Sequence, residues 1–121
     1  RKETDFLVLG SGIAGLTFAL KAAEKGKVMI MTKARADESN TKYAQGGIAG
    51  VMHAPDTFEK HIRDTLIAGA GLCREDVVRM VVTEGAERIR EIIEWETRFD
   101  RNAQADYDIA RQGGHSEHRV L

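Results

Sequence analysis

The chain has 121 residues, with 18 Lys and Arg against 19 Asp and Glu and a single Cys. The nearly balanced charge argues against a basic nucleic-acid-binding surface or a polybasic membrane-binding surface. Cys73 cannot form an internal disulfide, which fits a reducing compartment such as the cytoplasm, and no apolar run is long enough to span a bilayer.

The first predicted element is a strand over residues 5–9, which leads directly into three glycines at the spacing of a dinucleotide fingerprint. Gly10 allows a sharp turn, Gly12 lets a pyrophosphate approach the backbone, and Gly15 lets the following helix pack close to the strand. The helix N-terminus offers free amide groups and a partial positive charge to phosphates. The alternative is a turn in an unrelated α/β fold, which leaves the glycine spacing unexplained.

A helix is predicted directly after the fingerprint, because apolar side chains recur on one face, at Ile13, Leu16, Leu20 and Ala23. Lys25-Gly26 predicts the C-cap of this helix. The run over residues 27–32, apolar from Val28 to Met31, predicts a second strand, which completes a β-α-β unit of about 30 residues.

The second predicted strand ends at Thr32-Lys33, and the nearest carboxylates, Asp37 and Glu38, lie further into the loop. Nicotinamide-binding folds place an acidic residue about 20 positions past the glycines, where it binds the ribose 2′-hydroxyl. The sequence therefore argues against a standard NAD site. Lys33 is a candidate for binding the ribose or phosphate of an adenosine half, and the alternative is a solvated loop lysine.

Residues 39–49 place hydroxyl and amide side chains before the pair Gly46-Gly47. Small residues let backbone amides face a flat ligand, and glycine permits unusual dihedral angles. Taken alone, the stretch is typical of a polar loop that leads into a short strand over residues 48–52.

Two helices are predicted next, after a turn over residues 53–56. The first begins near Asp56, with Glu59 completing a capping box, and ends at residues 68–71. The second begins near residues 74–76, where acidic side chains suit a helix N-terminus, and runs to about Trp95. We interpret both helices as scaffold, with apolar core residues at Phe58, Ile62, Leu66, Val78, Met80, Val82, Ile89, Ile93 and Trp95.

The last part of the chain predicts a β-hairpin, with strands over residues 98–100 and 107–110 around a polar turn at 102–106. Residues 111–119 then combine two arginines, two histidines and a Gly-Gly pair, which suits an anionic substrate. Two alternatives are a metal bound by His115 and His118, although no Cys or acidic cluster lies beside them, and a solvated loop.

Four stretches in order along the chain resemble the L-aspartate oxidases, a branch of the succinate dehydrogenase/fumarate reductase flavoprotein family. They are Gly-Ser-Gly-Ile-Ala-Gly-Leu at 10–16, Thr-Lys-Tyr-Ala-Gln-Gly-Gly-Ile-Ala at 41–49, Asp-Thr-Leu-Ile-Ala-Gly-Ala-Gly at 64–71 and Gly-Gly-His-Ser-x-x-Arg at 113–119. The resemblance implies an α/β fold: a Rossmann-like FAD-binding β-α-β unit, followed by helices and a short β-hairpin. We expect residues 1–121 to be an incomplete, N-terminal part of an FAD-binding domain, without the cap and C-terminal helical domains of the family.

The resemblance implies FAD, rather than NAD, as the bound dinucleotide. The fingerprint would face the pyrophosphate, Lys33 the adenosine half, and the loop over residues 40–47 would run beneath the flavin. Respiratory members carry a histidine that holds FAD covalently where this chain has Asn40, so we expect noncovalent FAD. The expected cofactor-binding residues are Gly10, Ser11, Gly12, Ile13, Ala14, Gly15, Lys33, Asn40, Thr41, Lys42, Tyr43, Ala44, Gln45, Gly46 and Gly47.

The activity implied by the resemblance is oxidation of L-aspartate to iminoaspartate, with oxygen or fumarate as acceptor, in NAD biosynthesis through quinolinate. A functional link to quinolinate synthase would follow. His115 and Ser116 would lie on a substrate-side loop. Gln112 stands where the aspartate oxidases carry a catalytic Glu, and a carboxamide can accept a hydrogen bond from an ammonium group but cannot act as a base. The alternatives are a fumarate reductase or succinate dehydrogenase relative, and a fragment that is inactive by itself.

Overall fold

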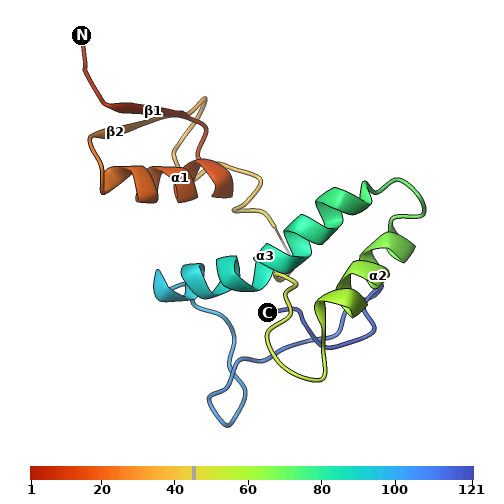
Figure 1. Cartoon of the computed structure of the whole chain (residues 1–121). Coiled ribbons are helices and arrows are strands. Elements are labelled where there is room, and N and C mark those ends of the chain that lie inside the picture. Colours follow the sequence, from red (N-terminus) through yellow and green to blue (C-terminus); the bar gives the residue numbers. More distant parts are fainter. Residues whose placement is uncertain (45) are drawn as a thin grey trace. The chain divides into compact units, whose positions relative to one another are not determined.

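The computed structural model describes residues 1–44 and 46–121 (Figure 1). The chain divides into two compact units, Arg1–Gly46 and Gly47–Leu121, which we call the N-terminal and the C-terminal unit. In the described residues, no helix is both long enough and apolar enough to cross a membrane.

The N-terminal unit is a β-α-β unit that consists of β1 (Phe6–Leu9), α1 (Ile13–Ala23) and β2 (Val28–Met31), drawn in red and orange in Figure 1. The two strands pair in parallel, with Phe6 opposite Val28 and Leu9 opposite Met31. Parallel pairing requires a crossover connection, which α1 provides. The predicted order of strand, glycine turn, helix and strand is confirmed.

Small side chains allow α1 to approach the strands closely. Ala19 and Ala22 are the buried residues of α1, and Val8 is the buried residue of β1. At Gly15, a methyl group in place of the hydrogen would overlap the carbonyl oxygen of Gly10 and lie 3.3 Å from the Val8 side chain. The bulkier apolar residues that predict the helix remain exposed in this unit, because the alanine face is the one turned to the strands: Ile13, Leu16 and Leu20.

The predicted C-cap at Lys25-Gly26 is wrong. The C-cap residue is Glu24, in a right-handed helical conformation, and the amide of Gly26 donates to the carbonyl oxygen of Ala22 at 3.1 Å. Gly26 is instead required by a close approach, since a side chain there would lie 2.7 Å from the carboxylate of Asp5. That carboxylate accepts a hydrogen bond from the Lys27 amide at 2.8 Å, which ties the start of β1 to the start of β2.

The C-terminal unit is built on α2 (Phe58–Ala68) and α3 (Glu75–Glu94), close to the predicted bounds. Its core contains Ile62 of α2 and three residues of α3 that share one helical face: Val82, Ala86 and Ile89. The prediction that Met80 and Trp95 lie in the core is wrong. Met80 is 53% exposed and Trp95 is 38% exposed, because Met80 points away from the buried face and Trp95 is the C-cap residue. Phe58, also predicted in the core, is 39% exposed at the first position of α2.

The predicted strand over residues 48–52 is replaced by a shorter pairing with the last residues of the chain. Ala49 and Ala110 each form an isolated antiparallel bridge with Val120, which is buried. The amide of Ile48 donates to the carbonyl of Leu121 and the amide of Leu121 donates back to Ile48, both at 3.0 Å. Within the predicted strand, the described backbone pairing therefore joins residues 48–50 to residues 119–121.

The predicted hairpin is present in reduced form. Its turn closes with a single antiparallel bridge between Arg101 and Tyr107, and the Asp108 amide donates to the Asp100 carbonyl at 2.9 Å. The rings of Phe99 and Tyr107 pack edge to face with centroids 6.3 Å apart. The polar turn lies where the sequence predicts it, but the flanking segments are too irregular to form longer strands.

Candidate cofactor site and a buried charge network

The glycine turn between β1 and α1 has the geometry that a phosphate site needs. Gly10 adopts φ +101°, a conformation that side chains disfavour, and its amide donates to the Met31 carbonyl at 2.8 Å. Gly12 is the N-cap of α1 and gives no side-chain hydrogen bond to the helix. The first turn of α1 therefore presents backbone amides and the positive end of the helix dipole.

The loop after β2 returns to this helix terminus. The hydroxyl oxygen of Thr41 accepts a hydrogen bond from the Ile13 amide at 3.1 Å. A side chain at Gly12 would lie 3.8 Å from the same hydroxyl oxygen. Two stretches that the sequence marks as candidate cofactor contacts, 28 residues apart, are thus adjacent in space, and Thr41 caps α1 in place of its own N-cap residue.

A cavity of about 460 Å³ lies at the carboxyl ends of β1 and β2. Dinucleotides bind in this position in open α/β sheets. Lys33 lines the cavity beside Ser11, so the structure brings these two predicted residues together. The lining residues are Leu9, Gly10, Ser11, Met31, Thr32, Lys33, Glu38 and Ser39.

This region fits a dinucleotide. A methyl group on Gly10 would meet no atom within 4 Å, so the space beside the turn is open, whereas Gly15 is held against the strand. Ser11 is buried, and Lys33 supplies a cation at the rim. The observed combination of open space, helix amides and a lysine suits a pyrophosphate and its ribose.

The other described residues of the predicted flavin loop are exposed. The ammonium of Lys42 pairs with Asp37 at 2.9 Å, and the hydroxyl of Tyr43 donates to Glu38 at 2.9 Å. Lys42 is the main cause of the lowered pKa of Asp37, with Arg35 adding to it. Asn40, Ala44 and Gly46 are also exposed, Gly47 belongs to the C-terminal unit, and Gln45 lies outside the described residues.

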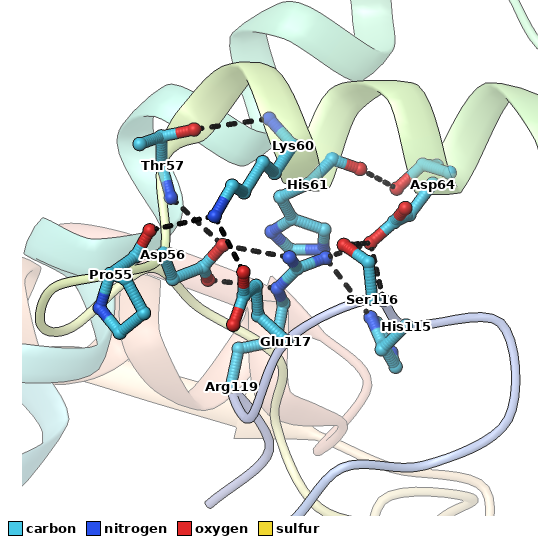
Figure 2. Close-up of polar contacts among 11 residues, drawn as sticks. Pro55, Asp56, Thr57, Lys60, His61, Asp64, His115, Ser116, Glu117 and Arg119 are labelled. Atoms are coloured by element: carbon cyan, nitrogen blue, oxygen red, sulfur yellow. Dashed lines mark hydrogen bonds and ion pairs between the residues drawn. The ribbon is translucent and has the colours of Figure 1, made fainter.

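The C-terminal unit contains a charge network centred on Arg119, which is fully buried (Figure 2). Its guanidinium forms a two-point contact with the Asp56 carboxylate, through Nε at 2.8 Å and Nη2 at 2.7 Å. Its Nη1 donates to Asp64 Oδ2 at 2.7 Å. Burial opposes the charge of Arg119, but hydrogen bonds and attraction from Asp56 and Asp64 raise its pKa further.

Asp64 connects this network to the Gly-Gly-His-Ser loop. Its Oδ2 accepts hydrogen bonds from both the amide and the hydroxyl of Ser116, each at 2.8 Å. Burial alone would raise the pKa of Asp64, but the hydrogen bonds from Ser116 and Arg119 outweigh burial and lower the pKa to about 2. Nearby, Lys60 on α2 pairs with Glu117 at 2.5 Å, which adds a second tie between the helix and the loop.

Two histidines lie beside Arg119. His61 is buried on α2, and its ring packs edge to face on His115 with centroids 5.6 Å apart. Burial, followed by the charges of Arg119 and His115, lowers the pKa of His61. Its Nδ1 is buried without a hydrogen-bond partner among the described residues. His115 Nδ1 lies 3.4 Å from Nη1 of Arg119.

These contacts correct two expectations. Arg119 is committed to two aspartates and cannot bind an anionic substrate directly. Asp56 does not form a capping box with Glu59: Thr57 is the N-cap of α2 and accepts from the Lys60 amide at 3.2 Å, while Asp56 binds Arg119. Gln112 is exposed and its backbone carbonyl accepts a hydrogen bond from the His115 amide at 3.2 Å, while the role of its side chain toward a substrate stays a prediction.

The two histidines proposed as alternative metal ligands occupy different surroundings. His115 lies in the network, whereas His118 lines a second cavity, of about 630 Å³, together with Tyr107 and Asp108. Within residues 1–44 and 46–121, no group of three or more His, Cys, Asp or Glu side chains could hold a metal ion.

Sequence reasoning missed the pairing of Arg119 with Asp56 and Asp64, which joins residues 63 and 55 positions apart. Asp64 and Arg119 each lie in a stretch that carries the family resemblance, but periodicity and spacing give no sign that they meet. The sequence around Asp56 is typical of a helix cap, so it predicts a local role and gives no indication of the pairing with Arg119.

Comparison with known proteins agrees with this geometry. The sequence model of a family described as "FAD binding domain" matches residues 5–121. The chain belongs to this FAD-binding domain family. FAD is therefore the cofactor that the chain's family binds.

Named relatives extend the comparison. The chain is 51% identical over 117 residues to L-aspartate oxidase 2-a, chloroplastic, of Nicotiana tabacum, which covers 97% of the chain and 18% of that protein. It is 44% identical to an L-aspartate oxidase of Streptomyces coelicolor, over 96% of the chain and 20% of the relative. A solved E. coli quinol fumarate reductase has a TM-score of 0.86 and 31% identity, over 97% of this chain and 20% of that chain. The chain thus spans about a fifth of the length of these proteins.

Proposed function

We propose that the chain is the FAD-binding segment of an L-aspartate oxidase, which oxidises L-aspartate to iminoaspartate. The observation that carries this proposal is the identity of 44–51% to proteins of that name in a bacterium and a plant, over nearly the whole chain. The fumarate reductase structure, by contrast, is 31% identical.

The proposed reaction removes a hydride from the Cα of aspartate and a proton from its ammonium group, which leaves a carbon–nitrogen double bond. FAD, when bound, supplies the acceptor for that hydride. Oxygen or fumarate is the proposed final acceptor of the electrons. The side chains of the protein position the substrate and stabilise its charge, while the redox chemistry belongs to FAD.

We assign the pyrophosphate of FAD to the first turn of α1, beside the open space at Gly10, where amides other than that of Ile13, which Thr41 caps, would receive a phosphate. Ser11 would face the pyrophosphate as well, Lys33 would contact the adenosine half, and the loop over residues 40–47 would lie along the flavin. Asn40 is exposed and carries a carboxamide, which cannot form the covalent bond that a histidine forms in respiratory members. The bound FAD is therefore noncovalent in this proposal, on a Rossmann-like unit.

We assign Gln112, His115 and Ser116 to the substrate side. Gln112 would accept a hydrogen bond from the substrate ammonium, because a carboxamide oxygen is an acceptor but not a base at neutral pH. Substrate-binding cations would come from outside residues 1–121, and the side chain at position 112 cannot take the ammonium proton. We therefore propose that the 121-residue chain alone does not oxidise aspartate.

A second candidate is a flavoprotein of the fumarate reductase or succinate dehydrogenase type, which acts on dicarboxylates without an amine. The TM-score of 0.86 to the quinol fumarate reductase favours it. An assay of the full-length protein with L-aspartate and with succinate separates the two. Turnover of aspartate with formation of iminoaspartate supports the first proposal, and turnover of succinate alone contradicts it.

Other partners follow from the proposed reaction. Iminoaspartate is unstable in water, and a quinolinate synthase that consumes it is the expected functional partner in NAD biosynthesis. We propose a reducing compartment, the cytoplasm in a bacterium, since the chain has one Cys. The tobacco relative is named chloroplastic, so the compartment would differ between organisms.

A further inference from the structure

We propose that Arg119 is a positioning residue that fixes His115 in the tautomer with its proton on Nε2. His115 would then offer the substrate a hydrogen-bond donor and not a base. The placement of His115 beside substrate rests on the function proposed above, whereas the tautomer rests on the contacts of Arg119 alone.

The first step is that Arg119 cannot rotate freely. Its side chain is fully buried, and three of its donors are held by carboxylates at 2.7–2.8 Å. Asp56 takes Nε and Nη2 in a two-point contact, and Asp64 takes Nη1. Planar two-point contacts of this kind fix the orientation of a guanidinium as well as its position.

The second step concerns the proton on the His115 ring. Nη1 of Arg119 lies 3.4 Å from His115 Nδ1 and is always a donor, since arginine stays protonated in proteins. A hydrogen bond between them requires Nδ1 to accept, and in a neutral ring the proton then lies on Nε2. The network thus selects one of the two tautomers that interconvert in water.

The third step is that the ring and backbone of His115 are held in place. The His115 amide donates to the Gln112 carbonyl at 3.2 Å, and the next amide, that of Ser116, donates to Asp64 at 2.8 Å. The buried ring of His61 packs against the His115 ring (Figure 2). Asp64 therefore positions Arg119 and the loop at the same time, through one carboxylate.

The consequence is a specific chemical role for His115. A ring with its proton on Nε2 and its Nδ1 occupied by Arg119 has no free lone pair with which to take a proton. It can donate to a carboxylate or carbonyl oxygen of the substrate. His115 would accordingly contribute to substrate binding, and proton removal would fall to another residue.

The tautomer can be read directly by solid-state ¹⁵N NMR of the full-length, FAD-loaded protein with labelled histidine rings. The buffer is mildly alkaline, where ordinary histidines are neutral. The spectrum of His115→Gln identifies the His115 signals by difference. We expect Nδ1 to be unprotonated and Nε2 to be protonated. A protonated Nδ1, alone or in a mixture with the other tautomer, overturns the proposal.

Variants test whether Arg119 is the cause. Arg119→Lys shortens the side chain and removes the planar fork, and Asp64→Asn removes the charge that aims Nη1. Asp64→Asn serves if Arg119→Lys does not fold. In either variant, we expect a protonated-Nδ1 component to appear, whereas the control Arg90→Lys, at an exposed position on α3, leaves the spectrum unchanged. A His115 spectrum that is unchanged in the folded variants overturns the proposal.

Kinetics distinguish positioning from a catalytic role. For aspartate, we expect Arg119→Lys or Asp64→Asn to raise KM by about tenfold, the size of one lost hydrogen bond, with little change in kcat. An equal fall in kcat and kcat/KM with unchanged KM would contradict the proposal that Arg119 acts by positioning His115 for substrate binding. If the full-length protein does not oxidise aspartate at all, the proposed function fails, but the NMR result still decides the tautomer.

Discussion

Asp64 is held in its charged form by the hydrogen-bond donors around it. Its ordinary pKa is 3.8, and hydrogen bonds from Ser116 and Arg119 lower it to about 2 in spite of burial. A carboxyl whose pKa is lower in the folded state stabilises that state above its unfolded pKa. The stability is lost as the pH falls through the folded value.

We predict that Asp64 contributes about 2 kcal/mol of stability above pH 4, and that this contribution disappears between about pH 4 and 2. Urea unfolding, followed across that range, measures it. The Asp64→Asn variant should show a flatter pH dependence there, while the control Asp106→Asn, at an exposed position in the hairpin turn, should follow the wild type. Parallel pH profiles for wild type and Asp64→Asn would contradict the assignment.

Gln112 is the residue at which this chain departs from the aspartate oxidases. We predict that Gln112→Glu in the full-length protein raises kcat for aspartate by about 10²-fold, because a general base typically contributes 10²–10⁴-fold. Steady-state assays with aspartate measure the change, and Gln104→Glu, in the exposed hairpin turn, is the matched control. Unchanged turnover in Gln112→Glu would place the residue away from the substrate amine.

At the scale of elements, α1 depends on a distant loop for its N-terminal cap. Gly12 has no side chain to cap the helix, and Thr41 supplies the hydroxyl that accepts from the Ile13 amide. The hydrogen bond therefore stabilises the helix and also fixes the loop beside the glycine turn.

We predict that Thr41→Val costs about 1 kcal/mol of stability in the N-terminal unit and lowers the amount of FAD retained by the full-length protein. Hydrogen exchange of the Ile13 amide and the flavin-to-protein absorbance ratio measure the two effects. Thr83→Val is the control, because the Thr83 hydroxyl bonds only to backbone within α3. Equal flavin retention in both variants would contradict the prediction that the Thr41 cap contributes to cofactor binding.

Elements with strong local signals were predictable. The β-α-β unit follows from apolar strands and glycine spacing. The end of α2 follows from Gly69, and the start of α3 follows from the acidic residues after Arg74. Errors arose where a distant partner overrides a local signal. Asp56 has the pattern of a helix cap, but Arg119 uses its carboxylate, and Gly26 has the pattern of a C-cap, but Asp5 requires its small size.

At the scale of the whole molecule, each of the two units is closed by contacts that no local pattern reveals. The Ile13–Thr41 bond spans 28 residues and the Arg119–Asp56 pair spans 63. The resemblance marks the stretches that contain Thr41, Asp64 and Arg119, so it indicates where the candidate sites lie. It does not indicate which residues pair, because pairing depends on how the loops return to the helices.

The central claim, a noncovalent FAD site on the β-α-β unit, is tested most directly by acid precipitation of the purified full-length protein. The visible absorption spectrum is recorded first, and the protein is then precipitated and the flavin in each fraction measured. We predict a flavin spectrum before precipitation and essentially all flavin in the acid supernatant afterwards. Flavin that stays with the precipitated protein, or a protein that retains no flavin, would contradict the account.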